Sequence, residues 1–360
     1  MNMDIVLSDP RRRNLAVLGL IALVSLLLAL GAIWQQAREG APVFASREFF
    51  PGFARDVRNV ARIHVASKAG AFDVVFVPEK GWVVPERENY PASFDLVQRT
   101  LVGLAALQTI EPKTARADWL HFVDLDAPPR GNGILITAGD EQGHALASLI
   151  TGKSEDIGDA TGAVGLFVRR PNEDQSWLVR SVLDPRASLS DWLDKRVMDV
   201  DRSRIQEVDV DPAGGARFVL ARSRPSDADF VLTPIPAGKT VADPSGPDGV
   251  ASAITSFGFD DVRTARSFDF GNAATTARVI TKTFDGLKVT ANVLKQGADY
   301  WATISAEPVD ASKPDAAKEA AAINAHASGW AYKLPAYKGQ LFMTTLDSLL
   351  KAPAATPAPQ

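Results

Sequence analysis

The chain has 360 residues, of which 46% are hydrophobic, and its 39 basic and 43 acidic side chains give a formal net charge of −4. The hydrophobic fraction is typical of folded proteins rather than disordered ones, and the slight acidic excess argues against a nucleic-acid partner. Because there is no cysteine, disulfides, thiolate metal sites and cysteine nucleophiles are all excluded.

The first predicted element is a run of twenty uncharged, mostly apolar residues at 15–34. As a helix it rises about 30 Å, enough to cross the hydrocarbon core of a bilayer. Arg11, Arg12 and Arg13 directly precede it, so the positive-inside rule predicts a cytoplasmic stub at 1–14 and export of the rest. A cleaved signal peptide is the alternative, but its apolar region is usually shorter, about 7–15 residues. We therefore expect an uncleaved anchor.

After the span, a connector at 35–59 leads to a segment at 60–200 whose pattern predicts one α+β unit. Its expected strands are 63–65, 72–77, 81–84, 133–138, 145–151, 164–168 and 177–182, with a closing helix at 189–195. A longer helix between the third and fourth strands has an apolar face made by Phe94, Val97, Leu101 and Leu104. That face is expected to cover the sheet.

The segment at 201–351 repeats the same order of elements at an offset of about 145–150 residues. Its expected strands are 205–210, 218–220, 230–232, 277–283, 287–294, 300–304 and 330–332, with helices at Val250 to Phe257 and 341–350. An alanine-rich insert at 312–327 predicts an additional helix, and a tail at 352–360 is expected to be disordered. The predicted fold is thus α+β: one membrane span, then two tandem repeats of mainly antiparallel sheet with covering helices.

The sequence contains few signs of a reactive site. The four histidines, at 64, 121, 144 and 326, lack the spacing of a zinc site, and no nucleotide-binding or nucleophile motif is present. Four aspartates at 199, 201, 209 and 211 could suggest calcium, but they lack the glycine-centred loop and are better explained as caps of a helix end and a turn. We expect no catalytic residue, metal or cofactor.

One short segment is a candidate interaction patch. Glu86, Arg87, Glu88 and Tyr90 follow the third expected strand and place two acidic, one basic and one aromatic side chain together. Such a group can bind a partner. A charged hairpin end before a helix also explains these residues. This structural interpretation is the favoured one.

Three runs resemble a known family. They are FPGFARDVRNVARIHV at 50–65, GWVVPERENYPASFDLVQRTLVGLAALQTIEPKTA at 81–115 and SWLVRSVLDPRASLSDWLDKRVMDVDRSRIQEVDV at 176–210. The chain resembles an uncharacterised bacterial family of membrane-anchored periplasmic proteins known only as a domain of unknown function. Its members are often encoded beside gliding-motility-type ABC transporter genes, which implies an accessory envelope subunit. The second unit matches less closely than the first, and no functional residues carry over.

The expected function is therefore binding. The preferred hypothesis is an accessory subunit in the inner membrane of a Gram-negative cell, with a cytoplasmic N-terminus and a periplasmic bulk. Its partners would be an ABC transporter permease and auxiliary envelope proteins, reached through the anchor, the sheet edges or the groove between the units. A stand-alone tethered ligand-binding or scaffold protein is the first alternative, and an enzyme acting on envelope polymers the second.

Overall fold

The computed structural model describes residues 24–27, 29, 46–272, 274–310 and 312–351. The predicted cytoplasmic stub with its three arginines, most of the predicted span, the first part of the connector and the tail lie outside the described residues. In the part of the chain that is described, no helix combines the length and apolarity needed to cross a bilayer.

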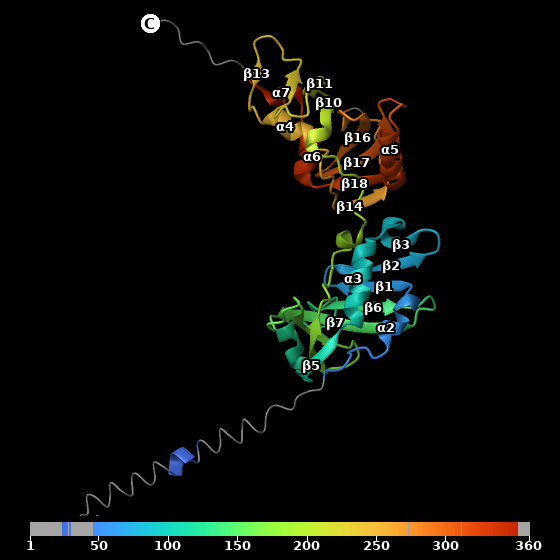
Figure 1. The fold of residues 1–360 in the computed structure, drawn as a ribbon, viewed down its shortest axis with the longest axis vertical. Coiled ribbons are helices and arrows are strands. Elements are labelled where there is room, and N and C mark those ends of the chain that lie inside the picture. Colours follow the sequence, from blue (N-terminus) through green and yellow to red (C-terminus); the bar gives the residue numbers. More distant parts are fainter. Residues whose placement is uncertain (1–23, 28, 30–45, 273, 311, 352–360) are drawn as a thin grey trace, which may run out of the picture.

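Two antiparallel sheets, arranged end to end, form the body of the molecule (Figure 1). The first has the strand order β4-β3-β2-β1-β6-β7-β8-β9-β5. Its strands are β1 (Arg62–Ser67), β2 (Gly70–Val77), β3 (Gly81–Val84), β4 (Tyr90–Pro91), β5 (Gln108–Pro112), β6 (Ile134–Gly139), β7 (Ala145–Glu155), β8 (Val164–Arg169) and β9 (Ser176–Ser181).

The second sheet has the order β12-β11-β10-β15-β16-β17-β18-β14, which matches the first strand for strand once β4 is set aside. Its strands are β10 (Ile205–Asp211), β11 (Phe218–Ala221), β12 (Val231–Thr233), β14 (Asp261–Thr264), β15 (Thr276–Thr283), β16 (Leu287–Gln296), β17 (Asp299–Pro308) and β18 (Trp330–Leu334). A separate two-stranded ribbon pairs β13 (Thr240–Val241) with β19 (Leu350–Lys351). The α+β class with mainly antiparallel sheets is confirmed.

The edge strands β5 and β14 were not predicted from the sequence. Both pair with only one full strand, β9 and β18 respectively, and both are polar, with the sequences QTIEP and DVRT. A half-exposed edge strand needs no apolar run, so its pattern resembles a loop.

Helix α3 (Phe94–Ala105) covers the first sheet, and Ser93 caps it by accepting a hydrogen bond at Oγ from the backbone N–H of Leu96 at 3.3 Å. Three residues of the predicted apolar face are buried, but Phe94 is 59% exposed. At 100° per residue, Phe94 lies roughly 100° from the centre of the buried face, so it falls at the margin of the contact.

The predicted closing helices are mostly wrong. The first is only the 3-10 turn η5 (Leu189–Trp192), because the backbone is extended at Leu193. The second divides into α6 (Ala336–Phe342) and α7 (Leu346–Leu349), since Thr345 is extended between them. The helix expected at Val250 to Phe257 ends early, as α4 (Gly246–Ala251). Ile254 and Phe257, which were expected on this helix, lie beyond its end but are buried.

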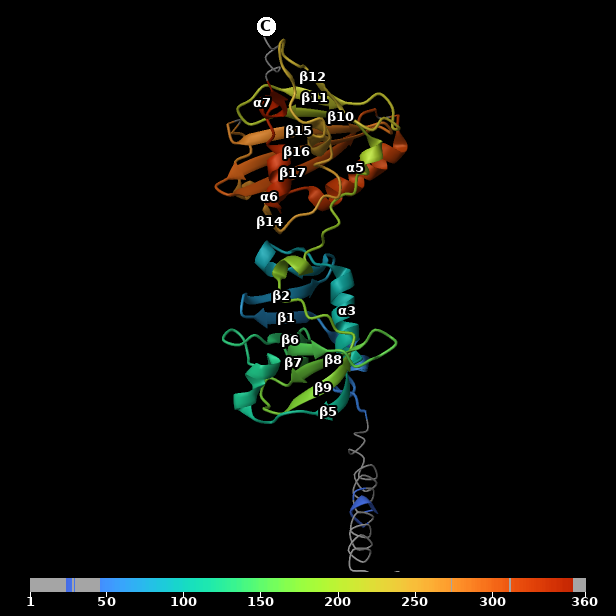
Figure 2. The ribbon, with the colours of Figure 1, turned by 90° about the vertical axis from the view of Figure 1, so that its left-hand side faces the viewer.

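The alanine-rich insert does form the predicted helix, α5 (Pro314–Ala327), which lies across β16 and β17 (Figure 2). Short elements complete the fold: α2 (Phe53–Asp56), η2 (Val57–Asn59), η3 (Pro85–Arg87), η4 (Ala117–Val123), η6 (Arg202–Arg204) and η7 (Ala265–Ser267). One buried apolar cluster extends from Phe49 in the first half to Leu350 in the second. The junction between the sheets is therefore part of the core.

Candidate functional site

The centre of the junction is an aromatic cluster around Tyr90. Its ring lies edge-on to three rings of the second half, with centroids 5.0 Å from Trp330, 5.9 Å from Phe259 and 6.2 Å from Tyr332. Tyr90 is 2% exposed, and its hydroxyl donates to the backbone oxygen of Asp194 at 2.9 Å. Burial raises the pKa of the Tyr90 phenol, which therefore stays neutral.

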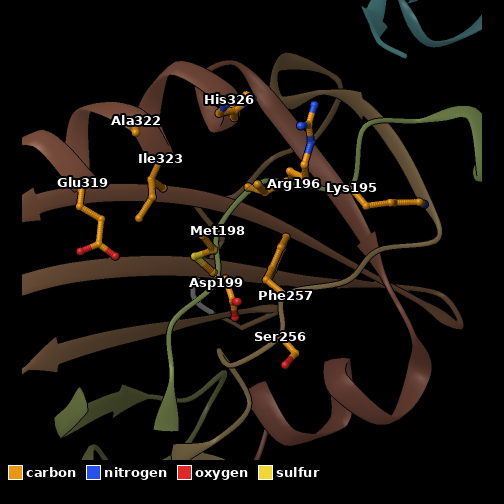
Figure 3. A pocket seen from close by; sticks show the side chains of 11 residues that line it. Lys195, Arg196, Met198, Asp199, Ser256, Phe257, Glu319, Ala322, Ile323 and His326 are labelled. Atoms are coloured by element: carbon orange, nitrogen blue, oxygen red, sulfur yellow. The ribbon is translucent and has the colours of Figure 1, made fainter. Parts of the chain in front are cut away.

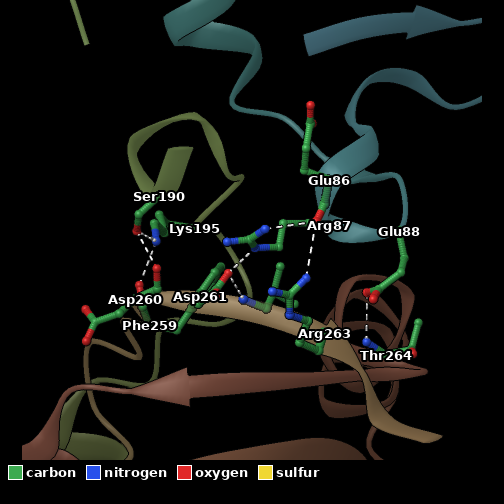
Figure 4. A network of polar contacts seen from close by, with 11 residues as sticks. Glu86, Arg87, Glu88, Ser190, Lys195, Phe259, Asp260, Asp261, Arg263 and Thr264 are labelled. Atoms are coloured by element: carbon green, nitrogen blue, oxygen red, sulfur yellow. Dashed lines mark hydrogen bonds and ion pairs between the residues drawn. The ribbon is translucent and has the colours of Figure 1, made fainter. Parts of the chain in front are cut away.

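A polar rim surrounds this cluster (Figure 4). The guanidinium of Arg87 pairs with the carboxylate of Asp261. The backbone oxygen of Glu86 accepts a hydrogen bond from Arg263 Nη1 at 3.2 Å.

Glu88 completes the rim, because its carboxylate accepts from the backbone N–H of Thr264 at 3.1 Å. The structure thus brings all four residues of the predicted interaction patch to the junction. Arg87, Glu88 and Tyr90 contact the second half of the same chain through their side chains, and Glu86 does so through its backbone oxygen. The carboxylate of Glu86 instead accepts from the backbone N–H of Asp73 in the first half at 2.9 Å. The buried Tyr90 is not available to a separate partner.

The joining segment, residues 182–204 between β9 and β10, adds a second set of contacts between the two halves. Ser190 Oγ donates to the backbone oxygen of Asp260 at 2.5 Å. Lys195 Nζ donates to the backbone oxygen of Phe259 at 2.6 Å and to Ser190 Oγ at 3.0 Å, and it lies 4.1 Å from the centroid of the Phe259 ring. Burial lowers the pKa of Lys195 to about 8, although three nearby aspartates oppose the shift.

The stability contributed at Lys195 is expected to rise with pH. Its pKa in the folded chain, about 8, is below the value of about 10.4 for an unfolded lysine. Between these values the unfolded chain binds more protons, so raising the pH favours folding. Urea denaturation of the wild type and of Lys195→Met should be measured between these two pH values. The free energy of unfolding of the wild type should rise relative to that of the variant as the pH increases. A difference that does not change with pH would contradict the buried amine.

A groove of about 520 Å³ opens beside the junction (Figure 3). One wall is the joining segment at 195–199, the other is α5, and residues 256–257 also line it. Its apolar part is made by Val197, Met198, Phe257, Ala322 and Ile323. Its polar part is made by Lys195, Arg196, Asp199, Ser256, Glu319 and His326. An apolar surface with a polar border is typical of a binding site.

Two of the charged groups in this groove are neutralised within the chain. Arg196 makes a two-pronged contact with the carboxylate of Asp194, at 2.9 Å for each pair of atoms. Glu319 accepts two hydrogen bonds from Arg204, at 2.9 and 2.6 Å. Because these charges are paired, the groove attracts a polyanion or polycation only weakly. It suits apolar side chains.

The other candidates from the sequence are dispersed. His64 contacts Asp73 at 2.8 Å between neighbouring strands, and His144 contacts Asp140 at 3.1 Å within a turn. Asp201 accepts from the backbone N–H of Ser203 at 2.7 Å as the cap of η6. The remaining members are placed as follows: His121 on η4, His326 and Asp199 in the groove, Asp209 paired with Arg217, and Asp211 exposed at the end of β10.

Across the described ranges, no group of three or more His, Asp or Glu side chains could hold a metal ion. A groove between the units was expected from the sequence, but the residues that line this one were not predicted. Helix α5 was recognisable, with buried residues Ala316, Ala320, Ile323 and Ala327, but nothing in its pattern reveals that residues 195–199 lie opposite.

Comparison with known proteins gives one match. The model of a family described as a domain of unknown function, DUF4340, matches residues 82–277, more than half of the chain. The matched region includes the predicted patch, the joining segment and β14. No curated protein and no solved structure was found to match. The chain therefore belongs to the DUF4340 family.

Proposed function

We propose that this chain is a membrane-anchored periplasmic accessory subunit of an ABC-type transport complex, and that it acts by binding a partner polypeptide in the groove between residues 195–199 and α5. The composition of the groove carries the proposal. Methionine and aliphatic side chains adapt to different partner shapes, while the polar border can supply hydrogen bonds for orientation.

The junction beside the groove supports a binding role. Both walls are attached to the continuous core, since Val197 and Ile323 are 2% and 5% exposed. A preformed groove loses little conformational entropy when it is filled, which favours affinity. The transport assignment rests on the apolar run at 15–34 and on the gene neighbourhood typical of the family that the sequence resembles.

A matched pair of substitutions on α5 tests the groove. Ala321 and Ala322 are both exposed neighbours, but only Ala322 is among the lining residues. The variant Ala322→Trp should fill the groove and abolish recovery of the partner, whereas Ala321→Trp should leave recovery unchanged. The measurement is crosslinking of the full chain in native membranes, extraction in mild detergent, and mass spectrometry of the proteins recovered.

The binding groove and the transport role can each be contradicted by a separate result. Equal recovery with both tryptophan variants would show that the partner binds elsewhere on the chain. Recovery of the wild type without any permease or ATPase would contradict the transport role and favour a stand-alone tethered protein. That alternative also requires that a chain without residues 1–37 retains full activity in the cell.

A further inference from the structure

The 3-10 turn η4 separates its side chains into rows. With three residues per turn, residues i and i+3 lie directly above one another. Leu120 and Val123 form one row, which packs against the first sheet in a small cluster with Leu125 and Ile150. The next row is Trp119 and Phe122, which are 48% and 63% exposed. Two large aromatic side chains of the same row therefore project into solvent, and the centroid of the His121 ring lies 3.9 Å from that of Phe122.

Basic side chains lie beside the turn that carries the two rings. The guanidinium of Arg116 lies 4.7 Å from the centroid of the Trp119 ring, and Lys153 Nζ donates to the backbone oxygen of Phe122 at 2.9 Å. Arg116 is also paired with Asp118 at 2.6 Å, so its charge is balanced locally. Aromatic rings beside basic side chains are the composition found at the headgroup level of a bilayer, and the balanced charge removes any need for anionic lipid.

The position of η4 in the fold points to the same partner. In the first sheet, β4 is the edge strand that faces the second sheet, and β5 is the opposite edge. The described body begins beside β5, where the backbone N–H of Thr109 donates to the oxygen of Arg47 at 2.8 Å. The 3-10 turn η4 follows β5 after four residues. It lies near β5, at the end of the body away from the second sheet, in both views (Figures 1 and 2).

The lengths of chain are compatible with membrane contact. From Gln108 along β5 to Ala117 the path is at most roughly 30 Å. The residues between the apolar run and the body, 35–46, reach at most about 40 Å when extended. The bilayer that holds the run is therefore within reach of η4, and the second sheet is on the far side.

We propose that Trp119 and Phe122 insert into the headgroup region of the membrane in which the chain is anchored, and so fix the orientation of the first sheet on the bilayer. The inference rests on the anchoring included in the proposed function. It names a lipid surface as the occupant of this patch, whereas the groove at α5 takes a polypeptide.

The cysteine-free sequence allows a direct test in the full chain. Single-cysteine variants Phe122→Cys and Trp119→Cys are labelled with an environment-sensitive fluorophore and reconstituted into phosphatidylcholine vesicles. Tyr337→Cys is the matched control, because Tyr337 is also 63% exposed but lies on α6 of the second half. Labels at 119 and 122 should show a blue-shifted emission that brominated acyl chains quench, and the label at 337 should show neither change.

Three results would overturn the inference. Vesicles that retain the protein through an alkaline wash but leave both η4 labels unquenched would contradict the insertion and leave the anchoring intact. Equal quenching at 337 would show that the contact is not specific to η4. Failure of the full chain to float with vesicles would contradict the anchoring, and the insertion with it.

Discussion

Replacing Tyr90 with alanine is expected to lower the free energy of unfolding by about 3–5 kcal/mol, as is typical when a buried aromatic side chain is truncated. The substitution removes the ring that lies against Phe259, Trp330 and Tyr332, and it leaves the backbone oxygen of Asp194 without its donor. Because this ring connects the cores of the two halves, we also expect unfolding to separate into two transitions.

The control is Tyr90→Phe, which retains the ring and removes only the hydroxyl that donates to Asp194. It should cost about 1 kcal/mol and preserve a single transition. Urea denaturation of the full chain, followed by circular dichroism and by tryptophan fluorescence, measures both quantities. An alanine variant no less stable than the phenylalanine variant would show that the aromatic contacts contribute little to the junction.

Replacing Gly339 with alanine should destabilise the chain by about 1–3 kcal/mol, the usual cost of overpacking. Gly339 lies within α6, and a Cβ atom there would overlap the ring and the Cβ atom of Tyr300. Tyr300 is only 8% exposed, so neither its ring nor the helix backbone can move away without a wider shift.

Gly249 provides the matched control, because it also lies in a helix, α4, but has space for a side chain. A Cβ atom there would meet Leu341 Cδ2 at 3.7 Å, an ordinary van der Waals contact. Gly249→Ala should therefore stabilise the chain by about 0.5–1 kcal/mol through helix propensity. Thermal unfolding of both variants should show midpoints that move in opposite directions. A shift of the same sign in both would contradict the close approach of α6 to Tyr300.

The central strands of both sheets could be predicted because their apolar residues form short runs or alternate, as buried strands require. Edge strands such as β14 carry no such pattern. The ends of helices were also mispredicted, since apolar residues such as Ile254 and Phe257 recur at helical spacing in backbone that is not helical. Burial sets the spacing of apolar side chains, but the backbone conformation depends on tertiary contacts.

The contacts of the candidate site could not be predicted from local sequence patterns either. Composition alone singled out the segment around Arg87 and Tyr90 as able to make contacts, and the structure places those contacts with residues 259–264 and 330–332 of the same chain. Only long-range pairing of the two halves determines this partner. The groove likewise needs residues more than a hundred positions apart, such as Met198 and Ile323, which no local pattern connects.

The end-to-end arrangement also shields one edge of each sheet from pairing with other molecules. A free strand edge presents unpaired N–H and C=O groups that recruit strands from other molecules. Here the outer edge of β14 faces the first sheet, and the carboxylate of Glu88 caps the outward N–H of Thr264. Each half therefore shields an edge of the other, and separating the two would create two surfaces prone to aggregation.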